Sequence, residues 1–227
     1  MPYNNYDYYD RDYYNYQRYQ DYQYRRYREQ ERKKKKGNGF LNFLLILFIL
    51  LCLAGISFNV YLRMNCICVL VDGSSMCDTL QDGDVLFINK TKNVKRGDIV
   101  VQDVTSYGEK FSGQFIIKRV IATEGDSLYC QDRQIYIRYA GTEEFVPLQE
   151  SYVSPEHNTN AERDFETVTV EEGKIFLMGD NRDVSKDRRY AGAMSVENVS
   201  GVVPDWALQF KEIIKLVYGR NVDSVGT

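Results

Sequence analysis

A run of twenty-three residues without a charge, from Phe40 to Leu62, most constrains how this chain can fold. A helix of that length crosses the roughly 30 Å hydrocarbon core of a bilayer. A soluble core helix would show a polar face, and a cleavable signal peptide would have a shorter apolar region followed by small residues. The run has neither feature, so we expect residues 37–63 to form one transmembrane anchor in a lipid bilayer.

The charges beside this run predict its orientation. Four consecutive lysines, residues 33–36, precede it, and only Arg63 follows it closely. Flanks rich in Lys and Arg stay in the cytoplasm. Residues 1–36 should therefore be cytoplasmic, and residues 64–227 should lie on the other side of the membrane.

The segment before the anchor has an unusual composition. Residues 1–30 hold eleven of the nineteen tyrosines, spaced among polar residues without a helical or strand period. The segment has almost no aliphatic surface to bury, so we expect residues 1–36 to be a disordered, Tyr-rich and basic tail. The net charge is −3, and a nucleic-acid binder would keep its basic residues on the folded part, so we expect no nucleic-acid partner.

The cysteines give no sign of a metal site. They form no CxxC pair, and the one histidine, His157, lies in a polar run typical of a loop. We therefore expect no metal and no organic cofactor. The five cysteines are Cys52, Cys66, Cys68, Cys77 and Cys130.

Residues 64–227 have the pattern of a mainly β, antiparallel domain. Short runs rich in Val, Ile, Phe and Tyr alternate with turn residues such as Gln81–Asp84. A polar stretch with two prolines, residues 143–165, indicates a small inserted cap over about residues 127–173. The expected strands are 67–71, 84–89, 98–104, 115–122, 134–139, 167–170, 174–178 and 199–203.

Two residues in this domain suggest an enzyme. Ser75 follows a glycine and a serine where a strand turns, a position that exposes a hydroxyl and successive backbone amides. Such amides can form an oxyanion hole. With a single loop histidine in the chain, the natural base for this serine is a lysine, and Lys118 lies in the apolar run 115–121.

Lys118 can act as a base only if it loses its proton. Burial disfavours the ammonium form and lowers a lysine pKa from about 10.4 by as much as three to five units. Arg119 cannot replace it, because a guanidinium stays protonated. Each residue also has an ordinary explanation: a Gly-Ser-Ser segment is usually only a turn, and a strand lysine usually reaches water.

A third segment favours the interpretation that Ser75 and Lys118 belong to an enzyme's active site. Strand 174–178 runs into a dense polar loop between Gly179 and Gly192. The loop could be only a solvated hairpin, but its Asn, Ser, Asp and Arg side chains also suit a shell that orients a lysine.

The three segments together resemble the type I (leader) signal peptidases, the membrane-bound serine–lysine proteases of bacteria, over most of residues 40–203. Four boxes in the same order behind an N-terminal anchor carry the resemblance. They are Ser75-Met76-x-x-Thr79-Leu80, Arg96–Val100, Lys118–Ile121 with Gly125-Asp126, and Gly179-Asp180-Asn181-Arg182 with Ser185, Asp187 and Arg189.

The resemblance implies a fold, an activity and site roles. It implies a single-pass protein of the bacterial plasma membrane, expected to be a monomer, that cuts signal peptides from secretory preproteins after small residues. Ser75 would be the nucleophile, with its own amide in the oxyanion hole, and Lys118 the base. Ser185 would hydrogen-bond the lysine, and Asp187 would pair with Arg189. The other supporting residues would be Met76, Gly179, Asp180 and Asn181.

The chain departs from the family pattern at several positions. The family usually has proline at Asp78, Leu-Pro at Thr123-Glu124 and serine at Arg188, and a hydroxyl that it can use for the oxyanion is replaced by Gly73. A carboxylate at Asp78 could hold Lys118 protonated.

These departures leave an alternative open: a catalytically weak relative that acts as a scaffold in the assembly of surface structures. A self-cleaving repressor or polymerase-subunit protease would use the same dyad. It would need a cytosolic domain, and the anchor argues against it.

Overall fold

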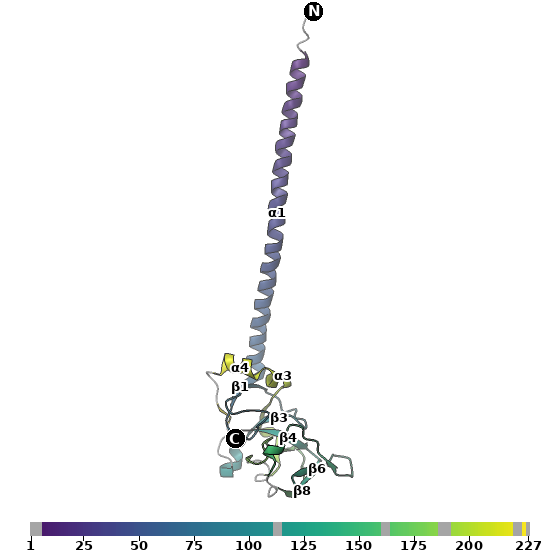
Figure 1. The fold of residues 1–227 in the computed structure, drawn as a ribbon, viewed down its shortest axis with the longest axis vertical. Coiled ribbons are helices and arrows are strands. Elements are labelled where there is room, and N and C mark those ends of the chain that lie inside the picture. The colour runs from purple at the N-terminus through teal and green to yellow at the C-terminus, as the bar shows by residue number, and fades with distance from the viewer. Residues whose placement is uncertain (1–5, 111–114, 160–163, 186–191, 220–223, 226–227) are drawn as a thin grey trace, which may run out of the picture. The chain divides into compact units, whose positions relative to one another are not determined.

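The computed structural model describes residues 6–110, 115–159, 164–185, 192–219 and 224–225 (Figure 1). The chain divides into two compact units, Met1–Val60 and Tyr61–Thr227. The first is a helix, and the second is built mainly from β-strands.

Helix α1 runs from Tyr6 to Asn65. Its part from Gly39 to Asn65 is the one helix in the described residues that is long and apolar enough to cross a membrane. The side chains of Phe40 to Tyr61 are exposed throughout, as expected for a segment whose natural surroundings are apolar.

The Tyr-rich tail differs from the expected disorder, because α1 continues back to Tyr6. Contacts one helical turn apart stabilise it. The Arg28 guanidinium donates to the Tyr24 hydroxyl and lies 5.2 Å from the centre of its ring, and Tyr27 donates to Glu31. Side chains four residues apart on a helix are neighbours, so aromatic and charged residues can stabilise a helix that buries nothing.

The second unit contains an eight-stranded sheet with the order β10-β9-β4-β3-β11-β2-β1-β12. All its pairings are antiparallel except β1 with β12. Its strands are β1 (Cys66–Val71), β2 (Val85–Asn89), β3 (Ile99–Asp103), β4 (Phe115–Thr123), β9 (Lys174–Met178), β10 (Met194–Ser195), β11 (Val199–Val202) and β12 (Ser224–Val225).

A second sheet has the order β7-β6-β5-β8 and is wholly antiparallel. Its strands are β5 (Ser127–Gln131), β6 (Gln134–Arg138), β7 (Val146–Pro147) and β8 (Phe165–Thr169). All four lie within the expected cap, about residues 127–173. The inserted segment is therefore a sheet of its own.

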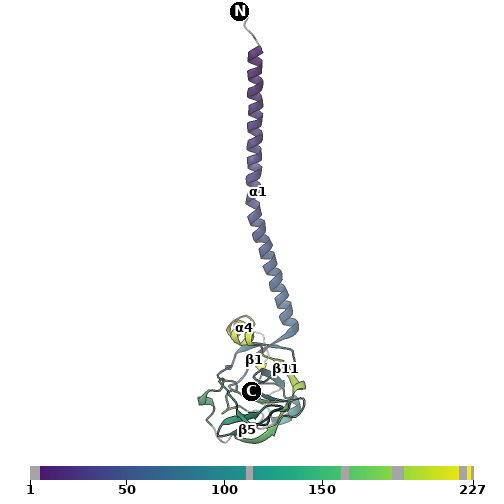
Figure 2. The same ribbon diagram turned by 90° about the vertical axis from the view of Figure 1, so that its right-hand side faces the viewer.

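Two short α-helices, α3 (Asp205–Gln209) and α4 (Lys211–Tyr218), contact β2 of the larger sheet. The described 3-10 helices are η1 (Thr105–Lys110), η2 (Pro155–His157) and η4 (Val196–Asn198). Helix α4 packs on β2. Figure 2, like Figure 1, shows α4 at one end of the domain and the second sheet at the other.

The core explains why the strands form where they do. Three clusters of buried apolar side chains lie on the two sheets. β4 contributes to all of them, since Ile117, Val120 and Ile121 each fall in a different cluster. With core on both faces, β4 reads as an almost continuous apolar run, and a polar side chain within it is drawn into the interior.

The mainly β, antiparallel prediction is confirmed, and each of the eight expected strands exists with bounds shifted by at most two residues. The strands that sequence analysis missed are β5, β7, β10 and β12. Three of them are two residues long, which is too short for an apolar period to be visible.

Candidate active site

Ser75 lies in a turn that follows β1. Gly73 adopts φ 94°, a left-handed conformation that favours glycine, and its amide donates to the Asp82 carboxylate over 2.9 Å. Met76 is buried in the core, and its carbonyl accepts the Leu80 amide. The turn is thus held on both sides of Ser75, which is only 4% exposed.

Lys118 lies in the middle of β4, opposite Val100 of β3. Its side chain is fully buried, at 0% exposure. Its Nζ lies 2.7 Å from Ser75 Oγ and 3.0 Å from the Ile117 carbonyl oxygen. The fold therefore brings together the two residues, 43 positions apart, that the sequence singled out.

Gly179 ends β9 and lies against the Ser75 turn. A Cβ at this position would collide with the Ser75 carbonyl oxygen and with Ser185 Oγ. The Asn181 amide donates to the Ser75 carbonyl over 3.0 Å, and the Ser185 amide donates to the Asn181 carbonyl over 3.1 Å. Only glycine permits this approach, so the loop after β9 is fastened directly to the backbone of Ser75.

Of the three remaining predicted supporting residues, the structure describes only Ser185. Ser185 is fully buried and lies beside Gly179. Asp187 and Arg189, and the departure at Arg188, lie outside the described residues.

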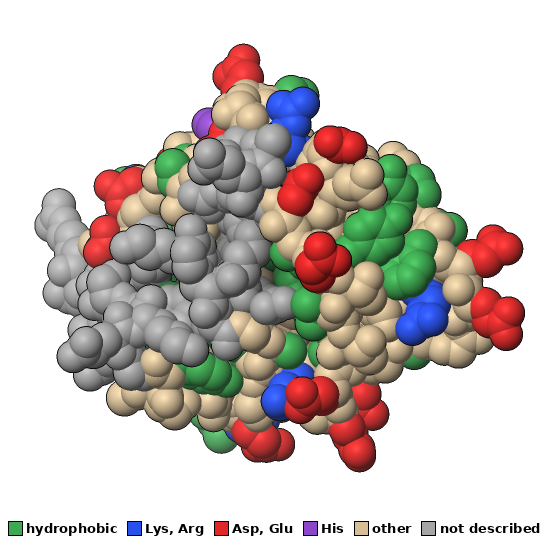
Figure 3. Space-filling view, turned by 90° about the horizontal axis from the view of Figure 1, so that it is seen from below, with side chains coloured by type: hydrophobic (Ala, Val, Ile, Leu, Met, Phe, Trp, Pro, Cys, Tyr) green, Lys and Arg blue, Asp and Glu red, His purple; other side chains and the backbone are tan. Residues whose placement is uncertain are grey.

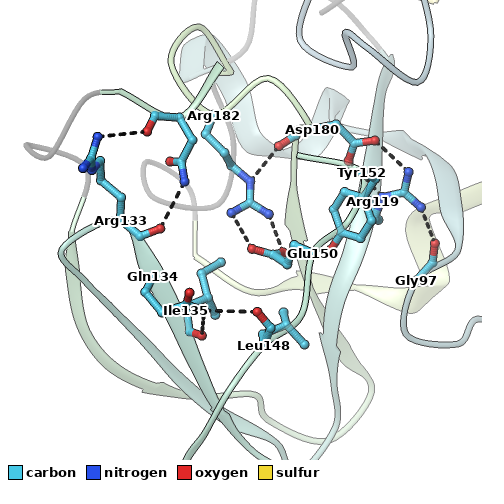
Figure 4. A network of polar contacts seen from close by, with 12 residues as sticks. Gly97, Arg119, Arg133, Gln134, Ile135, Leu148, Glu150, Tyr152, Asp180 and Arg182 are labelled. Carbon is cyan, nitrogen blue, oxygen red and sulfur yellow. Dashed lines mark hydrogen bonds and ion pairs between the residues drawn. The ribbon is translucent and has the colours of Figure 1, made fainter. Parts of the chain in front are cut away.

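Asp180 is fully buried and pairs with Arg119, the neighbour of Lys118 (Figure 4). The guanidinium donates to both carboxylate oxygens, over 2.9 and 2.7 Å, and also to the Gly97 carbonyl. Thr79, from the turn that carries Ser75, donates its hydroxyl to the same carboxylate. Asp180 thus joins the Ser75 turn, β4 and the loop after β9.

A second buried ion pair, between Arg182 and Glu150, joins this loop to the inserted segment that carries the second sheet. Arg182 donates through Nε to the Gly179 carbonyl over 3.0 Å and through Nη1 to Glu150 over 2.9 Å. Tyr152 donates to Glu150 over 2.8 Å, and the Arg119 guanidinium carbon lies 3.9 Å from the centre of its ring. Burial, and then the Glu150 carboxylate, raise the pKa of Tyr152 well above its usual value, so the hydroxyl keeps its proton.

Glu150 and Tyr152 are not among the site residues that the sequence predicts, because no local motif marks them. The sequence excludes Arg119 as a base, and its role as an ion-pair partner is visible only in the structure, where Asp180 lies beside it.

Comparison with known proteins decides the family. Residues 40–206 match the family described as "Signal peptidase, peptidase S26". The chain belongs to this family.

Individual signal peptidases are similar to this chain. "Signal peptidase I" of Bacillus licheniformis is 37% identical over 158 residues, which cover 64% of this chain and 78% of that protein. "Signal peptidase I T" of Bacillus subtilis is 38% identical over 124 residues, covering 53% and 62% respectively. A crystal structure of a signal peptidase I from Enterococcus faecalis is 31% identical and covers 49% of this chain and 97% of that one, with a TM-score of 0.38.

In this signal peptidase, Asp78 is turned toward the cap. Its side chain is 57% exposed, and its carboxylate lies 3.3 Å from Nδ1 of His157 in η2. The His157 carbonyl in turn accepts the Asp183 amide. The residue that stands where the family usually has proline therefore makes a contact between the serine turn and the inserted segment.

Cys77 lies two residues after Ser75 in this signal peptidase. Burial, and then the Asp78 carboxylate, raise the pKa of its thiol. A thiol attacks carbonyls as the thiolate, so Cys77 is a poor nucleophile near neutral pH.

Two further observations concern structural support and metals. Burial alone would raise the pKa of Asp126, but hydrogen bonds from Arg96 and from the Thr123 and Ala140 amides hold it below its usual value. Within the described residues, no three His, Cys, Asp or Glu side chains gather in a way that could hold a metal ion.

Proposed function

We propose that this signal peptidase is a membrane-bound serine endopeptidase that removes N-terminal signal peptides from exported preproteins, with Ser75 as nucleophile and Lys118 as general base. The observation that carries the proposal is the 2.7 Å distance between Ser75 Oγ and Lys118 Nζ inside the core. The other supporting residues are proposed to position this pair: Met76, Gly179, Asp180, Asn181, Ser185, Asp187 and Arg189.

The surroundings of Lys118 favour a neutral amine. A buried ammonium loses its hydration, and this loss lowers the pKa of a lysine. Two acceptors near Nζ, a hydroxyl and a backbone carbonyl, are both uncharged, so neither stabilises an ammonium as a carboxylate would.

The reaction proceeds through an acyl-enzyme. Lys118 takes the proton of the Ser75 hydroxyl while Oγ bonds to the carbonyl carbon of the scissile peptide, and the Ser75 amide donates to the oxyanion. The C–N bond then breaks, and Lys118 gives its proton to the leaving amine. Lys118 next takes a proton from a water molecule that attacks the ester carbonyl, and it gives that proton to Oγ as the C–Oγ bond breaks. The signal peptide leaves with its new carboxyl group, and the Ser75 hydroxyl and the neutral amine are restored.

The substrate is proposed to bind as an extended strand at the edge of β1, which leads into the Ser75 turn. Among the residues that the structure describes, β12 pairs with this edge at Leu70 and Val71. A substrate strand at the same place therefore replaces β12. Small substrate residues before the cut follow from the Ala-x-Ala pattern of signal peptides.

The anchor is proposed to lie in the plasma membrane with the tail in the cytoplasm, as the lysines before it favour. Protease added outside sealed, right-side-out vesicles should digest the domain and leave a protected fragment that contains the tail. Digestion of the tail from outside would contradict this orientation.

Cleavage of a labelled preprotein by the full chain, reconstituted in liposomes, tests the proposed activity. Turnover that disappears with Ser75→Ala supports the peptidase. Tight binding without cleavage would support the alternative of a catalytically weak scaffold in surface assembly. The observation that favours the alternative is Asp78, an acidic residue three positions after Ser75.

A further inference from the structure

One face of the tail part of helix α1 carries a regular row of side chains that the proposed reaction does not use. The row is spaced by three and four residues in alternation, and it consists of Tyr13, Tyr16, Gln20, Gln23 and Tyr27. At about 100° per residue, these positions fall within an arc of about 80° on the helix. All five side chains are exposed. We call these five residues the tyrosine stripe.

The tyrosines of the tail show no period when they are taken together, because others, such as Tyr14 and Tyr22, fall on different faces of the helix. The arginines have a period of their own. Arg18, Arg25 and Arg32 repeat every seven residues, and at about 100° per residue they lie on the side opposite to the tyrosine stripe. Helix α1 thus carries uncharged aromatic and amide side chains on one face and arginines on another.

The alternation of three and four residues is the pattern of positions a and d in a heptad, the seam along which two helices pack as a coiled coil. With Tyr13 at position a, the three arginines all occupy position f, which lies farthest from the seam. A tyrosine ring buries about 150–250 Å² when it is covered, so the stripe offers apolar area although it lacks aliphatic residues. Polar residues at a seam, such as Gln20, fix the register of the two helices.

Charges beside the stripe match across a parallel pair of helices. Arg26 occupies position g, and Glu31 occupies position e of the next heptad. In parallel coiled coils these two positions of different helices face each other and form ion pairs. Within one helix they point about 140° apart, and each contacts another side chain: the Arg26 guanidinium lies 5.6 Å from the centre of the Tyr22 ring, and Glu31 accepts the Tyr27 hydroxyl. Arg26 therefore complements Glu31 of a second copy.

The anchor favours contact between tails in a parallel arrangement. Helix α1 runs without a break from the tail into the segment Gly39–Asn65, and copies that insert in the same direction carry their tails on the same side. Confinement to one bilayer also raises the effective concentration of the tails. The face of the peptidase domain that Figure 3 draws has acidic side chains spread across it. Two such faces repel each other, whereas two tyrosine stripes do not.

We propose that the tyrosine stripe packs against the same stripe of a second copy of this chain, as a parallel two-stranded coiled coil in register. This inference rests on the anchor of the proposed function, which places both tails on one side of the membrane. It replaces the monomer that the family resemblance implies. The contact holds two peptidase domains in the same patch of membrane, so that a preprotein arriving there meets two Ser75 turns.

The experiment uses the full chain in phosphatidylcholine liposomes at low protein density, with the photo-crosslinker p-benzoylphenylalanine in the tail. In place of Tyr16 the crosslinker lies on the stripe, and in place of Arg18 it lies on the opposite face as the matched control. Because seam side chains insert into the partner helix while position f faces away, illumination should give at least about five-fold more covalent dimer from position 16 than from position 18. Denaturing gel electrophoresis measures the yield.

An exchange of charges tests the register in the protein that carries the crosslinker at position 16. Arg26→Glu or Glu31→Arg alone places like charges opposite each other, and each should lower the dimer yield by about two-fold to ten-fold. The double variant, Arg26→Glu with Glu31→Arg, restores the pairs with their signs reversed and should restore the yield. The same exchange within a single helix would have no such effect on the yield of dimer.

Each other outcome overturns the proposal. Equal yields from positions 16 and 18 mean that the copies meet only by random collision, and no dimer from either position means that the tails stay apart. A product larger than a dimer excludes a two-stranded pair, and failure of the double variant to restore the yield excludes the parallel register. The measurement needs no turnover, so it stands even if Ser75 and Lys118 prove not to be the catalytic pair.

Discussion

Two neighbouring residues of β4, Lys118 and Arg119, place their basic groups in opposite surroundings. Lys118 directs its amine to a hydroxyl and a carbonyl oxygen, both uncharged, inside the apolar core. Arg119 directs its guanidinium to the Asp180 carboxylate, which it binds through two hydrogen bonds. A guanidinium stays charged, and a carboxylate stabilises that charge, whereas an amine among neutral acceptors can give up its proton.

The difference suggests a division of labour between two regions. In the proposed reaction, the amine site around Lys118 needs a group that can change its charge. The ion-pair network around Asp180 and Arg182 needs groups that do not, because it holds the loop after β9 against the Ser75 turn. Substitutions in each region test whether the two can be disturbed separately.

The largest effect should come from Ser75→Ala. Without Oγ no acyl-enzyme can form, and loss of a catalytic serine lowers kcat by at least about 10³-fold in enzymes of this kind. Preprotein cleavage under single-turnover conditions measures it. Ser74→Ala, at the exposed neighbouring serine, is the matched control and should retain activity. Equal cleavage by the Ser75→Ala protein and the wild type would remove the serine from the mechanism.

Lys118→Arg should be almost as damaging as Lys118→Ala, with a loss of about 10²-fold to 10⁴-fold. Arginine keeps the positive charge but cannot accept the serine proton near neutral pH. In the wild type, activity should rise with pH as Lys118 loses its proton, with a midpoint below the usual lysine value of about 10.4. The pH dependence of kcat/KM measures this limb.

A matched control separates loss of the base from loss of the fold. Lys174→Arg changes a strand lysine on β9 that pairs with Glu171 at the surface, and it should leave both activity and thermal stability unchanged. If the Lys118→Arg protein is as active as this control, charge alone suffices at position 118 and the contrast with Arg119 disappears.

In the ion-pair network, Asp180→Asn should mainly lower the free energy of unfolding. Removing one partner of a buried ion pair costs about 3–5 kcal/mol, because the Arg119 charge loses its compensation. Urea unfolding of the full chain in detergent measures the change in the free energy of unfolding. Glu166→Gln, at an exposed site on β8, should cost almost nothing. A stable Asp180→Asn protein with a shifted pH–activity midpoint would mean that Asp180 belongs to the amine site instead.

The contrast between the amine site and the ion-pair network also explains which site residues the sequence could predict. Ser75, Lys118 and Gly179 stand in local patterns, a turn after a strand, a polar residue in an apolar run and a glycine at a strand end. Glu150 and Tyr152 stand in a polar stretch with no period, and their partners are 32 and 33 positions away along the chain. Ion pairs between distant segments depend on the packing of two sheets, which no local pattern encodes.

The Tyr-rich tail is the opposite case, in which local contacts decide the structure. Residues 1–30 have almost no aliphatic surface to bury, which predicts disorder, whereas helix α1 begins at Tyr6. Contacts between Tyr24 and Arg28 and between Tyr27 and Glu31 are local, and a helix that has already started at the anchor needs no new nucleus.

Glu150→Gln should have an intermediate effect. The amide cannot pair with the Arg182 charge, so the hold of Arg182 on the Gly179 carbonyl should loosen, at a cost of about 1–3 kcal/mol. We expect kcat to fall more than KM rises, because the loop touches the Ser75 backbone. Steady-state cleavage kinetics measure the two constants, with Glu144→Gln at an exposed cap position as the control. An unchanged kcat would show that the network supports the fold without positioning the serine.

The smallest effect should come from Tyr152→Phe, which keeps the ring against Arg119 and removes only the hydrogen bond to Glu150. One such bond contributes about 0.5–1.5 kcal/mol. Because the pKa of Tyr152 is raised in the folded state, its stabilising contribution is complete below the unfolded value of about 10 and falls as the pH rises above it. The stability difference between wild type and Tyr152→Phe should therefore be constant near neutral pH and shrink above pH 10, as urea titrations at several pH values can measure. Tyr136→Phe, whose ring stacks on Tyr129, is the control. A difference that grew with pH would mean that the network stabilises the phenolate, and the network would then resemble the amine site in holding a group that changes its charge.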